Sequence, residues 1–153
     1  MVTTHKISAE LYDDSFKLIA MHCGLESYAM AYHLNKSAEL QLSRCEKDLD
    51  VSSTSFPIYE WKDEINDHYW TLVCNTVKEE KESEALGLFS NEKAVSAYHL
   101  VEERKEVDYF LKVEADNSII IEEAVKKINS IPKVLTAYSV EVATLKSKRN
   151  LIF

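Results

Sequence analysis

The chain has 153 residues, enough for one domain with its own hydrophobic core, and we expect a single α+β domain over 1–153. Its 26 acidic and 18 basic residues give a net charge of −8, which disfavours direct binding to nucleic-acid phosphates. Only Gly24 and Gly87 are glycines, too few for the loops that hold phosphates in P-loop and dinucleotide-binding proteins.

The sequence also bears on the compartment. No stretch approaches the roughly 18 consecutive apolar residues of a membrane span, so no membrane contact is predicted. The first residues, MVTTHKISAELYDD, lack the basic flank and apolar run of a secretory signal. The cysteines, Cys23, Cys45 and Cys74, form an odd and widely spaced set, which favours free thiols. We therefore expect a cytoplasmic protein.

The first third of the chain predicts a strand, a helix and a second strand. Residues 16–23, FKLIAMHC, form a short apolar run that is typical of a buried strand. From Leu25 to about Asn35, apolar residues recur every three or four positions, which indicates a helix. Residues 38–45 alternate loosely and are expected to return as a strand.

The middle of the chain predicts a hairpin. Residues 55–61 and 68–77 are rich in aromatic and β-branched types, and a polar turn joins them. Residues 78–93 are highly charged, and we expect them to form a mobile connection or a short surface helix. A further strand is expected near 95–101.

The last part of the chain repeats the plan of the first. Residues 107–114 alternate as a strand, and Asp116-Asn117-Ser118 supplies a cap for a helix that ends before Pro132. Residues 134–142 alternate as a last strand. We expect a mostly antiparallel sheet with two β-α-β units, helices packed on one face, and a central aromatic hairpin.

Large aromatic residues are concentrated in the predicted hairpin. Alternation places some of them on the sheet face that does not meet the core, and such residues are common binding anchors. We therefore predict an interaction surface for a protein partner or a second copy of the chain, formed by Tyr59, Trp61, Tyr69 and Trp70. The alternative is that a helix covers this face, which would leave the basic and apolar segment 145–153 as the better candidate.

No pattern in the sequence predicts a cofactor, a metal or a catalytic group. The five histidines show no metal-binding spacing, and no GxSxG turn is present. Glu103 and Asp108 are the pair most suited to acid–base chemistry, but carboxylates beside the start of a strand more often bind backbone N–H groups. We predict that Asp108 accepts hydrogen bonds and that Tyr109 is buried.

Residues 101–109, VEERKEVDY, resemble the signature of the IPExxxVDY family, which is found largely in Bacteroidota. The signature positions are occupied by Val101, Glu103, Val107, Asp108 and Tyr109. Glu102 stands where the family has proline, which leaves the turn before the strand less rigid. FKLIAMHC, IYEW and the NLIF ending also look like the family. The resemblance implies no activity, cofactor or catalytic residue.

These observations favour a non-catalytic cytoplasmic adaptor or regulatory protein that acts through a protein–protein interaction surface. The alternative is a sensor that binds a small metabolite, resembling the regulatory ACT-like modules. A small enzyme of unknown reaction is the third hypothesis.

Overall fold

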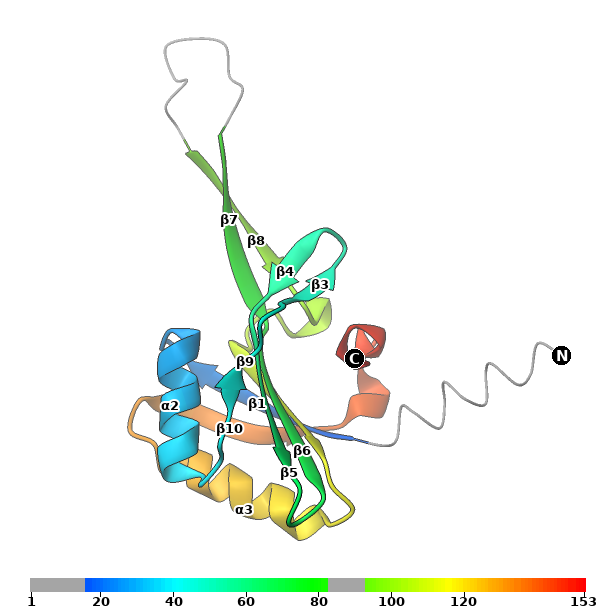
Figure 1. Cartoon of the computed structure of the whole chain (residues 1–153). Helices are drawn as coiled ribbons and strands as arrows, with labels where there is room; N and C mark the ends of the chain where they lie inside the picture. The colour runs from blue at the N-terminus through cyan, green and yellow to red at the C-terminus, as the bar shows by residue number, and fades with distance from the viewer. Residues whose placement is uncertain (1–15, 83–92) are drawn as a thin grey trace, which may run out of the picture.

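The computed structural model describes residues 16–82 and 93–153, and within them the chain has an α+β fold with mostly antiparallel sheets and two α-helices (Figure 1). The predicted fold class is therefore confirmed. Neighbouring strands of the main sheet are antiparallel throughout. In spatial order the six strands are β10 (Val134–Val140), β1 (Lys17–Cys23), β9 (Tyr109–Glu114), β6 (His68–Cys74), β5 (Ile58–Asp63) and β2 (Ser43–Arg44).

Both helices pack on the same face of this sheet. Helix α2 (Ser27–Ser37) and helix α3 (Ser118–Asn129) share one hydrophobic cluster with alternate residues of the strands, such as Leu111. The predicted cap of α3 is present, because the Asn117 side chain accepts a hydrogen bond from the Ile119 N–H at 2.9 Å.

The opposite face of the sheet is covered by irregular segments. Three 3-10 turns, η1 (Glu102–Arg104), η2 (Val142–Thr144) and η3 (Lys148–Leu151), lie in or beside the segments that pack there. The cluster on this face includes the fully buried Phe110 and Leu151. The central strand β9 is thus covered on both faces of the sheet, so side chains that point to either face are packed against other residues.

The strand predicted over 38–45 is nearly absent. Only β2 forms there, and it pairs with β5 rather than with β1. The Asn35 side chain explains the difference, because it donates to the Leu42 carbonyl at 3.0 Å and accepts from the Leu42 N–H at 2.8 Å. Helix α2 therefore holds this segment as a loop, in which Leu40 and Leu42 are still buried.

In the second half of the chain, β9 and β10 pair with opposite edges of β1. Both are antiparallel to β1, so they run in the same direction as each other, with α3 between them in the sequence. The β10 backbone is also held by Asn129, whose side chain donates to the Ala137 carbonyl and accepts from the Ala137 N–H, each at 2.8 Å. This contact protects the middle of an edge strand from pairing with another chain.

A two-stranded ribbon, here called the arm, extends away from the body (Figure 1). It consists of β7 (Thr76–Glu82) and β8 (Lys93–His99), paired in antiparallel register. The prediction of a mobile connection or a helix is wrong for 78–82, which belongs to β7. The side chains of Lys78 and Glu80 are exposed, so their charges are compatible with a strand. The remainder of that prediction, 83–92, lies outside the described residues.

A second short hairpin lies beside the arm (Figure 1). It consists of β3 (Leu49–Val51) and β4 (Thr54–Phe56). Neither α2 nor α3 is long and apolar enough to cross a membrane, and no other helix of the described residues is.

Candidate functional site

The segment that precedes β9 is held by one buried side chain, Asn75. Its amide Nδ2 donates to the carbonyls of Arg104 and Val107, and its Oδ1 accepts from the Val101 N–H, all at 2.8 Å. Asn75 itself is fully buried, at the junction of β6 and the arm. One side chain thus satisfies backbone groups at the start and at the end of the turn 101–107.

The two carboxylates of this segment also bind backbone N–H groups. Asp108 Oδ2 accepts from the Cys23 N–H at 2.8 Å, as the sequence predicted. Glu103 accepts from the Ser147 N–H at 2.8 Å and from the Ser147 hydroxyl at 2.6 Å. Partial burial raises the pKa of Glu103, but the hydrogen bonds from Ser147 outweigh it, so the pKa lies below its usual value. The two carboxylates therefore attach this turn to β1 and to the C-terminal segment.

Tyr109 is buried, at 7% exposed, as the alternation of the strand predicts. Its hydroxyl donates to the carbonyl of Leu25, in the loop between β1 and α2. Burial raises the pKa of Tyr109 well above its usual value, so the phenol remains a hydrogen-bond donor at neutral pH.

We expect Asp108→Asn to lower the free energy of unfolding by about 1 kcal/mol, because a charged hydrogen-bond acceptor becomes a neutral one while the Cys23 N–H keeps a partner. Urea titration of both proteins at pH 7 measures the difference. Asp116→Asn, an exposed change in the loop before α3, is the control and should have almost no effect. A loss of several kcal/mol, or none, would contradict this role.

The predicted aromatic surface is wrong for two of its four residues. Tyr59 and Trp70 are 7% and 4% exposed, and both belong to the cluster beneath the helices. The Ser27 hydroxyl at the start of α2 lies 3.1 Å from the Tyr59 hydroxyl, so a helix does cover this face. Trp61 is half-buried against the same cluster, and Tyr69 is half-buried. The four residues therefore do not form one exposed patch.

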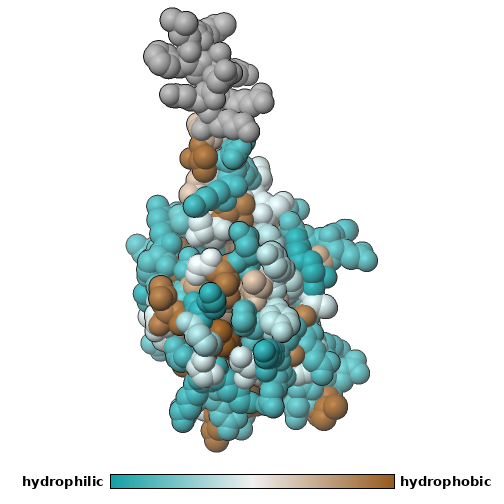
Figure 2. Space-filling model, turned by 90° about the vertical axis from the view of Figure 1, so that its left-hand side faces the viewer, coloured by the Kyte–Doolittle hydropathy of each residue, from teal (hydrophilic) through white to brown (hydrophobic). Residues whose placement is uncertain are grey.

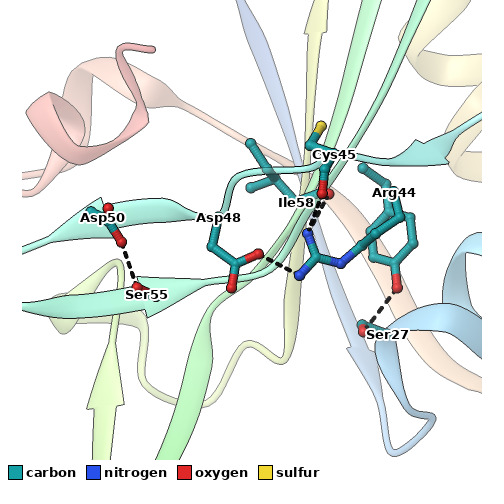
Figure 3. A network of polar contacts seen from close by, with 8 residues as sticks. Ser27, Arg44, Cys45, Asp48, Asp50, Ser55 and Ile58 are labelled. Atoms are coloured by element: carbon teal, nitrogen blue, oxygen red, sulfur yellow. Dashed lines mark hydrogen bonds and ion pairs between the residues drawn. The ribbon is translucent and has the colours of Figure 1, made fainter.

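A network of polar contacts lies at the edge of the sheet formed by β2 (Figure 3). The Arg44 guanidinium donates to the Cys45 carbonyl at 2.9 Å, pairs with Asp48, and lies 5.7 Å from the centre of the Tyr59 ring. The same guanidinium reaches the Ile58 carbonyl at 3.4 Å. Arg44 thus occupies backbone acceptors at a sheet edge, which is a structural role.

The signature segment and the base of the arm line a cavity of about 670 Å³ that is open to solvent. Asp108 and Tyr109 line it from β9 and the turn before it. The other lining residues come from the end of β1, the loop before α2, the end of β6, the arm and the turn after η1, and they are Cys23, Gly24, Leu25, Glu26, Cys74, Thr76, Lys78, Ala97, His99 and Lys105. Its lining includes two residues of the family signature, and it also carries both acidic and basic side chains. The other cavities described for residues 16–82 and 93–153 contain no signature residue.

Two of the cysteines lie at this cavity, and burial makes the thiol of Cys74 less reactive. Cys23 and Cys74 are buried free thiols, and burial raises the pKa of Cys74 to about 11. A thiol with a raised pKa is a poor nucleophile at neutral pH. No group of three or more metal-binding side chains occurs among residues 16–82 and 93–153.

Lys112 is a buried cation that the sequence did not reveal. It is 3% exposed, and its Nζ lies 4.7 Å from the ring centre of Phe16 and 4.3 Å from that of Phe153. The same Nζ donates to a backbone oxygen of Phe153 at 3.4 Å. Burial lowers the pKa of this ammonium group, and the charges of Glu114 and Glu60 oppose the shift.

Comparisons of the chain with protein-family models, with curated proteins and with solved structures found no match.

Proposed function

We propose that this chain is a non-catalytic adaptor or regulatory protein that binds a partner protein through its arm. The observation that carries the proposal is the arm itself, a two-stranded sheet that leaves the body and keeps edges of its own (Figure 1). An exposed strand edge is a template for pairing with an extended segment of another chain. The occupant that we propose is such a segment, added along the outer edge of β8.

The orientation of the β8 backbone supports this choice of edge. The Leu100 N–H donates to the Asn75 carbonyl at 2.8 Å, so at position 100 the N–H points toward the side of β7. Backbone N–H groups alternate between the two edges of a strand, and the β7–β8 register is regular. The N–H of Val95 therefore points outward, and its side chain is 60% exposed.

The side of the molecule on which α2 lies offers a weaker surface. Figure 2 shows its hydrophobic residues as small groups separated by hydrophilic ones. Tyr28 and Tyr32, which are 71% and 59% exposed on α2, are the largest aromatic residues exposed there. Scattered exposure of this kind is common on monomeric proteins and does not indicate a partner.

Val95→Pro tests the arm, because proline removes the outward N–H and its ring blocks strand addition, whereas the ladder with β7 is kept. Val95→Thr is the matched control, since it keeps both the N–H and the β-branched shape. We expect affinity purification from native lysate to recover a stoichiometric partner with the wild type and with Val95→Thr. Val95→Pro should weaken that association at least about tenfold, with little change in the melting temperature.

A monomeric wild-type chain without a stoichiometric partner would contradict the adaptor function. A partner that binds Val95→Pro as well as the wild type would show that binding occurs elsewhere, and the segment 145–153 would be the next surface to test. Light scattering on the purified chain distinguishes a protein partner from a second copy.

A second candidate function is supported by the cavity at the base of the arm. Its volume of about 670 Å³ is in the range typical of small-molecule sites. It lies between the loop before α2 and the sheet, next to the proposed interaction surface. A sensor that binds a small metabolite there is the alternative to the adaptor, and an enzyme has no comparable support.

We also propose that the chain belongs to the IPExxxVDY family. The support is the set of matching residues and the common role of their contacts, which join residues 101–108 to three other parts of the chain. A cytoplasmic location is proposed on the basis of the three free cysteines, which suit a reducing compartment.

A further inference from the structure

The rim of the cavity at the base of the arm carries charges of both signs. Lys78 comes from β7 and Lys105 from the turn after η1, whereas Glu26 precedes α2 and Asp108 precedes β9. The ammonium of Lys105 has only an exposed ion pair with Glu102, at 3.6 Å, which is a weak interaction. Lys78 and Glu26 make no side-chain ion pair with another described residue.

The floor of the cavity is less polar than its rim. Cys74 and Tyr109 are buried there, and the Tyr109 hydroxyl is already used by the Leu25 carbonyl. Ala97 lines the wall on the arm side. A ligand would therefore meet charged groups at its outer end and weakly polar surface at its inner end.

We infer that this cavity binds a small zwitterionic solute of the free amino acid class. A ligand that carries only a carboxylate or a phosphate would face Glu26 and Asp108, and one that carries only an ammonium would face Lys78 and Lys105. A ligand with both groups has a partner for each charge, and its side chain fits the less polar floor. The inference rests on the second candidate function, the sensor.

The test is a thermal-shift screen of the full chain with the standard amino acids. Each amino acid is compared with the amine that lacks its carboxylate and with the acid that lacks its ammonium. At a hundredfold excess over the dissociation constant, the bound amino acid should raise the melting temperature by roughly 5 to 10 °C. The matched amine and acid should give a much smaller shift.

Two variants locate the effect. Lys78→Gln and Asp108→Asn should each abolish most of the shift, because each removes a charge from the rim. Lys36→Gln and Asp116→Asn remove the same charges from exposed positions outside the cavity and should keep the shift.

Alkylation of the thiols gives a readout that does not depend on the variants. Cys74 lines the cavity and Cys45 does not, and burial raises the pKa of both thiols to about 11. The amino acid should slow alkylation of Cys74 about tenfold or more and leave Cys45 unchanged.

The inference is overturned if no amino acid shifts the melting temperature, or if the matched amine or acid alone is as effective. It is also overturned if protection is equal at Cys74 and Cys45. In each of these cases a partner protein could still be captured in a way that depends on Val95. Failure of the amino-acid inference is therefore distinguishable from failure of the adaptor function.

Discussion

Asn75→Ala is expected to lower the free energy of unfolding by about 3 to 5 kcal/mol, the largest effect of any polar substitution that we predict. The substitution removes three hydrogen bonds of 2.8 Å, to the carbonyls of Arg104 and Val107 and to the Val101 N–H. Two of these bonds are buried, so the groups left behind lose their partners without gaining water. Urea or thermal unfolding of the purified variant measures the loss.

Two controls separate this role from the general cost of deleting an asparagine. Asn129→Ala removes two hydrogen bonds to Ala137 that are only partly buried, and it should cost about 1 to 2 kcal/mol. Asn75→Asp keeps the acceptor for Val101 but places a negative charge beside two carbonyls, so it should be no better than alanine. A loss below about 1 kcal/mol for Asn75→Ala would show that the turn holds without this side chain.

The alternation of single strands predicted local features of the site correctly. The pattern over 107–114 placed Tyr109 toward the core, and Asn117 was identified as part of the cap of α3. Asp108 was expected to accept a hydrogen bond, and it does. Each of these features depends on residues within one element or at its end, which a sequence shows directly.

The contacts between distant segments were not predictable in this way. Asn75 bonds residues 26 to 32 positions away, and a lone asparagine between two strands otherwise indicates a solvated turn. The faces of Tyr59 and Trp61 were assigned together correctly, but no strand pattern shows which face α2 covers. The strand expected near 95–101 is present as β8, but the pairing strand β7 was not predicted beyond residue 77, because the charged residues that follow were interpreted as a loop or a helix.

Lys112→Met is expected to raise the free energy of unfolding by about 1 to 2 kcal/mol at pH 7, since replacing a buried charge with an apolar side chain of similar length is often stabilising. The ammonium is 3% exposed and forms no ion pair with an Asp or Glu side chain of the described residues, and its hydrogen bond goes to a backbone oxygen of Phe153. Cation–π interactions with the rings of Phe16 and Phe153 offset part of the free-energy cost of removing the ammonium from water. Methionine keeps part of that contact through its sulfur.

The pH dependence tests the cause of the gain. Burial lowers the pKa of Lys112 in the folded chain below its ordinary value of 10.5, so the unfolded chain binds more protons between those two pKa values. The stability of the wild type, relative to Lys112→Met, should therefore rise as the pH increases through the lowered pKa toward 10.5. The cysteines and tyrosines are the same in both proteins, so their titration cancels when the free energy of unfolding of one protein is subtracted from that of the other.

Lys17→Met, at an exposed position of the neighbouring strand β1, is the matched control and should change the free energy of unfolding by no more than about 0.5 kcal/mol at any pH. A Lys112→Met variant that is less stable than the wild type by the same amount at every pH would contradict the prediction. That result would mean that the contacts of the ammonium with Phe16 and Phe153 outweigh its desolvation. Lys112 would then hold the C-terminal segment on the sheet, and Phe153→Ala should cost a similar amount.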